Sequence, residues 1–268
     1  MDPDLLLEAL LLGIVEGLTE FLPVSSTGHL ILAVDLMGFR GPPGHVFEVV
    51  IQLGAIGAVL WAYLERFWRA ASGFFSEPDQ FRFVRNLLLA FVPTVIVGGL
   101  AYGFIKAYLF DRPWVVVTML ILGGLAILWI ERHLPAPRHH AVEQMPARTA
   151  FAIGLCQVVS MIPGVSRAGA TIMGGLMLGL DRRTATEFSF FLAVPTMLAA
   201  SVLDLYKNWE RIDADSLLVI AVGFVAAFVS ALIVVRWLIG FVSRHGFGPF
   251  AWYRIVIGLV MAAILLAR

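Results

Sequence analysis

A short apolar stretch of the sequence, EGLTEFLPVSSTGH at residues 16–29, combines two carboxylates, three consecutive hydroxyls and a histidine. Glu16 and Glu20 are four residues apart, so on a helix they share one face. Ionisable groups at membrane depth are costly and usually functional. The alternative is that both acids are polar contacts in a helix bundle. That alternative explains each residue but not their convergence, so we predict a functional site here.

The second part of this stretch predicts a break between two helices. Pro23 ends the first helix, because proline lacks an N–H group and clashes with the preceding turn. Hydroxyls favour the first positions of a new helix, and three of them follow the proline, together with a glycine and a histidine: Ser25, Ser26, Thr27, Gly28 and His29. An ordinary helix cap is the structural alternative for these hydroxyls.

A related stretch, PGVSRAGAT, occurs at residues 163–171. Pro163 and Gly164 break a helix, and Ser166 can cap the next one. Free N–H groups and the positive dipole end make a helix start suitable for an anion. Arg167 adds a planar fork that matches phosphate oxygens. An arginine near the membrane midplane needs an anionic partner, which is either a carboxylate of the first stretch or a bound phosphate. Phosphate is the favoured partner, because helix start, hydroxyls and guanidinium all suit it.

Carboxylates beside phosphate would repel it unless a proton or a metal lay between them. A divalent cation, Mg²⁺ or Ca²⁺, is the simplest answer, because hard cations bind carboxylate and phosphate oxygens together. Glu20 and Glu16 are then the expected metal ligands. The nucleophile stays open between Ser26, His29 and a water activated by a carboxylate.

Composition identifies the class of protein that positions these residues. Of 268 residues, 60% are hydrophobic and 14% charged, whereas a soluble domain carries about 25% charged residues. The net charge of +0 gives no sign of a nucleic-acid partner. We predict an all-α polytopic membrane protein forming a single integral membrane domain over residues 1–268. The acidic start, MDPDLLLEALLLG, differs from a basic signal-peptide start, so we expect it to be retained.

Six segments are apolar and long enough, at about 20 residues, to cross a bilayer. They are residues 45–64, 86–105, 114–130, 187–205, 216–235 and 250–267. Two further segments are broken: 5–22 ends at Pro23 and 149–162 ends at Pro163, and each is followed by a short apolar piece. Broken segments at corresponding places in two halves indicate an inverted repeat with its site at the midplane.

A shift of 141 residues aligns the two halves. Gly13, Glu16 and Ser25 then coincide with Gly154, Gln157 and Ser166. We therefore predict two re-entrant helix pairs beside the six transmembrane helices. The repeats span approximately residues 1–110 and 145–268, with a linking helix at 114–131. Chance coincidence of Gly and Ser is the alternative.

The distribution of basic residues sets the expected orientation. With the N-terminus outside, twelve Lys and Arg residues, Arg254 among them, fall on the cytoplasmic side and six outside, with Arg167 the last of the nineteen. The positive-inside rule supports this arrangement. The first re-entrant pair then enters from outside and the second from the cytoplasm.

Four motifs, EGLTEFLPVSSTGH, FEVVIQLG, PGVSRAGAT and EFSFFLAVP, occur in this order. Together they resemble the bacterial undecaprenyl-diphosphate phosphatase family, also called the bacitracin-resistance protein family. The resemblance covers essentially the whole chain. It implies an enzyme of the bacterial cytoplasmic (inner) membrane that hydrolyses the C55 lipid diphosphate to the monophosphate, recycling the carrier for cell-wall synthesis. It also implies a divalent metal and a site open to the outer face.

The resemblance also implies roles for individual residues. The expected catalytic residues are Glu16, Glu20, Ser26, His29 and Arg167. The expected substrate-binding residues are Ser25, Thr27, Ser166 and Thr171. Ala168 departs from the family, which commonly has a second serine there, so one hydroxyl contact is in doubt.

A transporter or flippase of polyprenyl phosphate is the rival interpretation, because inverted repeats with re-entrant tips are typical of alternating access. Transport needs the Arg167 cradle but not the full set of acid, serine and histidine. The expected partners are the polyprenyl diphosphate and membrane lipids, without nucleic acid, and the sequence leaves a homodimer open.

Overall fold

The computed structural model describes residues 3–39, 46–105, 112–208 and 216–267, and these form eleven α-helices, one short 3₁₀ turn and no strand. In chain order the helices are α1 (Pro3–Thr19), α2 (Ser26–Met37), α3 (Val46–Ala62), α4 (Leu64–Ser72), α5 (Pro78–Ile105), α6 (Pro113–Arg132), α7 (Ala147–Val159), α8 (Arg167–Met177), α9 (Arg182–Asn208), α10 (Leu217–His245) and α11 (Gly248–Ala267). The 3₁₀ turn, η3, covers Val142–Gln144. The all-α prediction is confirmed.

Among the described residues, five helices are long and apolar enough to cross a bilayer. They lie within α5, α6, α9, α10 and α11, and the pair α3 and α4 makes a sixth if it counts as one span bent by 71°. The protein is therefore a multi-pass membrane protein. Five of the six ranges predicted to span each fall on one helix to within a residue. The sixth, 45–64, begins at residue 45, which lies outside the described residues, and covers the 17-residue α3 and the first residue of α4. Pro93 lies inside α5, which continues through it.

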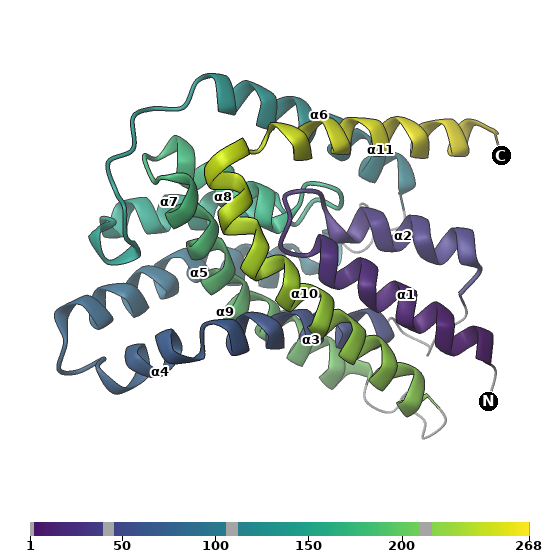
Figure 1. The fold of residues 1–268 in the computed structure, drawn as a ribbon, viewed down its shortest axis with the longest axis horizontal. Coiled ribbons are helices and arrows are strands. Elements are labelled where there is room, and N and C mark those ends of the chain that lie inside the picture. The colour runs from purple at the N-terminus through teal and green to yellow at the C-terminus, as the bar shows by residue number, and fades with distance from the viewer. Residues whose placement is uncertain (1–2, 40–45, 106–111, 209–215, 268) are drawn as a thin grey trace.

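The two broken segments are short helices joined by loops. α1 and α2 have 17 and 12 residues, and α7 and α8 have 13 and 11. In Figure 1, α1 and α2 occupy the right-hand part of the molecule, and the loop between them lies near its middle, whereas α7 and α8 lie on the left. This arrangement brings the two loops toward each other.

Close contacts between small residues hold these short helices. α1 packs against α10, and α7 packs against α5. A Cβ atom on Gly13 of α1 would overlap the carbonyl of Gly223 in α10, and one on Gly154 of α7 would overlap the carbonyl of Ala90 in α5. Glycine at these two positions lets backbones approach, which favours helix association inside a membrane.

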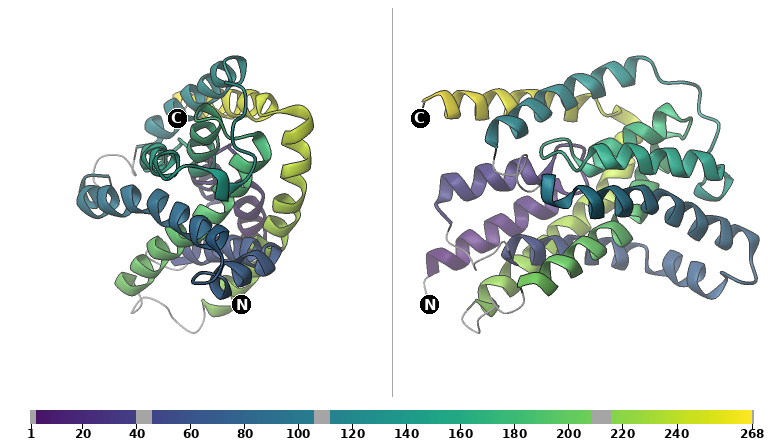
Figure 2. Two further views of the ribbon diagram at one scale, coloured as in Figure 1. Left: turned by 90° about the vertical axis from the view of Figure 1, so that its left-hand side faces the viewer. Right: turned by 180° about the vertical axis from the view of Figure 1, so that it is seen from behind.

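Helices α6 and α11 lie side by side along one edge of the molecule, as both Figure 1 and Figure 2 show. The α6 helix also contacts α2 and α8, the second member of each short pair. Because α11 packs on α6, and α6 contacts α2 and α8, the C-terminal helix lies close to the loops that precede these two short helices.

Candidate active site

The loop between α1 and α2 contains the first group of candidate residues. The helix ends at Thr19, and the N–H of Glu20 still bonds to the carbonyl of Glu16 at 2.9 Å. A turn then leads to Ser25, which has a positive φ of 69°. An L-residue in such a conformation is strained by about 1–3 kcal/mol, so the surrounding structure must hold it. α2 begins at the next residue, Ser26.

The loop between α7 and α8 also ends in a serine with positive φ. Gly164 has φ of 94°, and Ser166, immediately before α8, has φ of 76°. Ser25 and Ser166 are the two non-glycine residues with positive φ in the described chain. As predicted, Ser166 caps its helix, because its hydroxyl accepts a hydrogen bond from the N–H of Gly169 at 3.0 Å. Ser25 makes no such side-chain cap.

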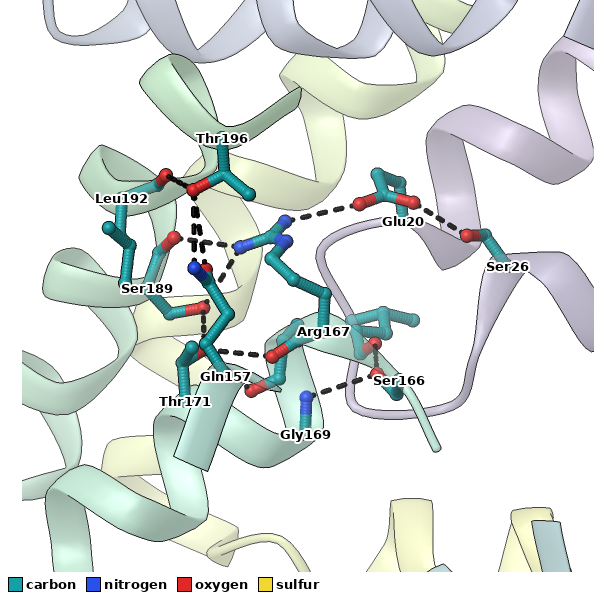
Figure 3. A network of polar contacts seen from close by, with 12 residues as sticks. Glu20, Ser26, Gln157, Ser166, Arg167, Gly169, Thr171, Ser189, Leu192 and Thr196 are labelled. Carbon is teal, nitrogen blue, oxygen red and sulfur yellow. Dashed lines mark hydrogen bonds and ion pairs between the residues drawn. The ribbon is translucent and has the colours of Figure 1, made fainter. Parts of the chain in front are cut away.

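Arg167 joins the two loops (Figure 3). Its Nη2 lies 3.1 Å from Oε1 of Glu20. The other carboxylate oxygen, Oε2, accepts a hydrogen bond from the hydroxyl of Ser26 at 2.5 Å. Glu20 and Ser26 are buried, and the Arg167 side chain is only 12% exposed. Three of the five predicted catalytic residues therefore form one continuous chain of polar contacts, in which Arg167 is paired with a carboxylate.

A serine that was not predicted, Ser189 of α9, holds the other side of the guanidinium (Figure 3). Nη1 of Arg167 donates to the Ser189 carbonyl at 2.8 Å and to its hydroxyl at 3.2 Å. Thr171, a predicted substrate-binding residue, lies 2.8 Å from the same hydroxyl. The motif EFSFFLAVP contains this serine, and its place within a charged and aromatic span was the signal that could have singled it out.

Glu16 lies buried beside this chain with no hydrogen-bond partner for either carboxylate oxygen. Its charged neighbours include Glu20 and Arg167. The Nε of Arg167 is also buried without a partner. Unpaired buried groups of this kind are costly unless a ligand satisfies them. Glu16 therefore has the free coordination that the metal prediction requires.

His29 is oriented differently from the other predicted catalytic residues. Its Nδ1 lies 2.8 Å from the carbonyl oxygen of Ser25. Its Nε2 lies 2.8 Å from the hydroxyl of Tyr253 in α11. Because both ring nitrogens have these partners, the imidazole is not hydrogen-bonded to Ser26, whose hydroxyl donates to Glu20.

Arg254 of α11 is the second residue that sequence reasoning missed. Its side chain is wholly buried. The guanidinium donates to five backbone carbonyls, two in α6 and three in the loops: Met119, Leu120, Pro23, Gly164 and Val165. The charge count assigns Arg254 to the cytoplasmic side as one of the charges beside a span that could be assigned otherwise, and the structure shows that it is buried and bonded to both loops. A basic residue beside the end of a span cannot be told from a surface charge by sequence alone.

The remaining predicted substrate-binding residues lie on the same two loops and first turns. Ser25 is buried, and Thr27 is half-buried on the first turn of α2. Ser166 contacts the opposite loop, since its hydroxyl lies 3.4 Å from the carbonyl of Leu22. All nine predicted site residues thus fall on the two short helix pairs or the loops between them.

The carboxylates of Glu16 and Glu20 are the groups at this site that could bind a divalent cation. Among the described residues, no group of three or more His, Cys, Asp or Glu side chains is close enough to hold a metal. Mg²⁺ typically takes only one or two carboxylates and completes its shell with water and substrate phosphate. The unpartnered carboxylate of Glu16 next to Glu20 fits that requirement.

Comparison with known proteins gives the family. The family model described as "Bacitracin resistance protein BacA" matches residues 9–260. The chain belongs to this family. Within it, the chain is 55% identical over 263 residues to a protein of Paramagnetospirillum magneticum named undecaprenyl-diphosphatase 2, covering 98% of this chain and 100% of that protein.

Two more relatives carry the same kind of name. Proteins named undecaprenyl-diphosphatase from Cereibacter sphaeroides and Dechloromonas aromatica are 54% and 55% identical to this chain, over 97% and 98% of its length. The resemblance based on the four sequence motifs is confirmed.

Proposed function

We propose that this protein is a lipid phosphatase that hydrolyses undecaprenyl diphosphate to undecaprenyl phosphate and inorganic phosphate. The observation that carries the proposal is the buried chain Arg167–Glu20–Ser26, which sets a phosphate-binding guanidinium against a hydroxyl and a carboxylate. The relatives bear the name of this activity. In a bacterial cytoplasmic membrane the product would return to cell-wall synthesis as the lipid carrier.

Ser26 is the proposed nucleophile. Its oxygen attacks the terminal phosphorus, its proton passes to Oε2 of Glu20, and the bond to the bridging oxygen breaks to release undecaprenyl phosphate. The 2.5 Å hydrogen bond supports this pairing of nucleophile and base. Water then attacks the phosphorus of the phosphoserine, the bond to the serine oxygen breaks, inorganic phosphate leaves, and the proton on Glu20 returns to the serine oxygen. The position of His29, bonded to Ser25 and Tyr253, favours Ser26 over the imidazole as nucleophile.

Arg167 is proposed to bind the phosphoryl oxygens once the substrate competes with Glu20 for its guanidinium. Fixed donors aimed at developing charge are a major source of rate enhancement. The hydrogen bonds from Nη1 to Ser189 hold the group in place while Nη2 exchanges partners. Ser25, Thr27, Ser166 and Thr171 are the proposed substrate-binding residues around it.

A divalent cation, Mg²⁺ or Ca²⁺, is proposed to be held by Glu16 and Glu20. When bound, it supplies the positive charge that allows carboxylates and phosphate oxygens to share one site. The unpartnered oxygens of Glu16 are the structural support for this proposal. The chain's own contribution is to keep the carboxylate buried and free of competing hydrogen bonds.

The proposed architecture is an inverted repeat in which α1–α2 and α7–α8 are re-entrant pairs. Two observations support it. The positive-φ residues Ser25 and Ser166 coincide under the 141-residue shift. The helix contacts exchange in the same way, since α1 packs on α10 of the second half and α7 packs on α5 of the first.

The activity is tested with purified protein in detergent, undecaprenyl diphosphate and Mg²⁺, by measuring released phosphate. We expect release without any sealed membrane, its loss with a chelator, and its loss in Ser26→Ala. A transporter or flippase would release no phosphate under these conditions. Substrate labelled on the terminal phosphate then identifies the nucleophile in a quenched reaction. Label on Ser26 is expected, whereas label on neither Ser26 nor His29 would indicate attack by water.

A further inference from the structure

The hydrogen bonds of His29 fix where its proton resides. Nδ1 lies 2.8 Å from the carbonyl oxygen of Ser25, and a carbonyl only accepts, so Nδ1 carries hydrogen. In the neutral ring Nε2 is then the acceptor, and its partner at 2.8 Å is the hydroxyl of Tyr253. Tyr253 therefore donates to His29. The two rings are parallel within 2°, and their centroids lie 5.4 Å apart.

This bond joins two distant parts of the chain around a strained residue. His29 is buried in α2, and Tyr253 is 43% exposed in α11. The Ser25 carbonyl that His29 contacts belongs to the residue with φ of 69°, which immediately precedes the proposed nucleophile Ser26. The backbone N–H of His29 also bonds to that carbonyl, at 3.4 Å, so the imidazole supplies the shorter of its two hydrogen bonds.

The imidazole of His29 makes no hydrogen bond to Ser26. The Ser26 hydroxyl is committed to Glu20. Arg254, the residue after Tyr253, is the charged neighbour of the imidazole, and its guanidinium is bonded to backbone carbonyls. The tyrosine hydroxyl is thus the group that fixes the outer nitrogen of His29.

We propose that Tyr253 is a positioning residue for the phosphatase reaction, acting through His29 on the turn that presents Ser26. This inference rests on the proposed function. The hydroxyl holds the imidazole in its Nδ1–H form, and the imidazole holds the carbonyl of Ser25. The nucleophile is thereby kept against Glu20, and substrate binding by Arg167 is untouched. A positioning role of this kind affects turnover rather than substrate affinity.

The test is a double-mutant cycle measured as phosphate release. Tyr253→Phe removes one oxygen from a half-exposed side chain, so the ring packing is kept. We expect kcat to fall about tenfold, the scale of one hydrogen bond, with KM within about twofold. In a His29→Asn background the same substitution should change nothing further, because contacting groups give non-additive effects. Tyr206→Phe, the same deletion on a tyrosine that is 83% exposed in α9, is the matched control.

A spectroscopic readout separates positioning from a general effect on folding. In protein with ¹⁵N-labelled histidine, the signal of His29 is the one lost in His29→Asn. We expect its Nε2 resonance to shift in Tyr253→Phe while Nδ1 stays protonated. An unchanged kcat in Tyr253→Phe, an effect that persists in the His29→Asn background, or an unmoved Nε2 resonance would overturn the proposal. An inactive parent protein would instead overturn the proposed function, and with it any role of Tyr253 in the reaction.

Discussion

The loops α1–α2 and α7–α8 end in a serine of the same unusual conformation but have opposite chemistry. Each ends in a serine with positive φ directly before a short helix, at Ser25 and Ser166. The first loop is flanked by carboxylates, and the second is followed by Arg167. In the proposed function, the first loop supplies the base and the nucleophile, and the second supplies the arginine that binds phosphate. The site exists only where the two loops meet.

The difference extends to the helices before the loops. In the proposed inverted repeat, Glu16 and Gln157 occupy equivalent positions in α1 and α7. The amide of Gln157 is satisfied by the hydroxyl of Thr94 at 2.6 Å, whereas the carboxylate of Glu16 has no hydrogen-bond partner. Gln157 therefore makes a structural contact, whereas the carboxylate of Glu16 can still bind a ligand.

The largest expected effect is at the arginine, which the first loop lacks. Arg167→Ala should lower phosphate release by on the order of 10³-fold or more, the range by which arginines that stabilise transferring phosphoryl groups act. Arg167→Lys should recover only part of it, because an ammonium lacks the fork that reaches Glu20 and Ser189 together. Initial rates at saturating substrate measure both variants. Arg69→Ala, at an exposed arginine of α4, is the control. Turnover of Arg167→Ala near the parent rate would show that Arg167 does not bind the phosphate.

The next largest effect is expected at Arg254, whose substitution should destabilise both loops. Arg254→Met would leave carbonyls of Pro23, Gly164 and Val165 without their donor, and each buried unpaired group costs about 1–3 kcal/mol. We expect a large drop in thermal unfolding temperature together with loss of activity. Arg244→Met, at the exposed end of α10, should be close to the parent. A stable, active Arg254→Met protein would mean that the loops hold their spacing without this anchor.

Sequence patterns anticipated the parts of the molecule that local chemistry determines. The two proline-containing breaks and the cap by Ser166 follow from helix-breaking residues and from the capping preference of hydroxyls. The pairing of Arg167 with Glu20 is the carboxylate alternative, whereas the sequence favoured phosphate as its partner. Arg254 and Tyr253 could not be found in this way. Their partners are backbone carbonyls and a histidine that lie far away in the sequence, and only the packing of α11 on α6 brings them together.

The equivalent positions Glu16 and Gln157 give a smaller and more specific prediction. Glu16→Gln should raise the Mg²⁺ concentration needed for half-maximal activity by at least the roughly 10- to 100-fold seen when groups around a metal are removed. Gln157→Leu should weaken stability through Thr94 but leave the metal requirement unchanged. A Mg²⁺ titration of phosphate release after chelation measures both. Equal shifts in the two variants would show that Glu16 is not a ligand.

The smallest effect compares the two serines at the helix starts. Ser166→Ala should lower stability by about 1 kcal/mol, the usual cost of losing an N-cap bond, because its hydroxyl accepts from Gly169. Ser25→Ala should cost less, since that side chain makes no cap bond. Thermal unfolding in one detergent ranks the two variants against the parent. If Ser25→Ala lowered stability more than Ser166→Ala, the strained turn before Ser26 would depend on the hydroxyl of Ser25. The hydrogen bond from His29 to the backbone carbonyl would then not be what stabilises this turn.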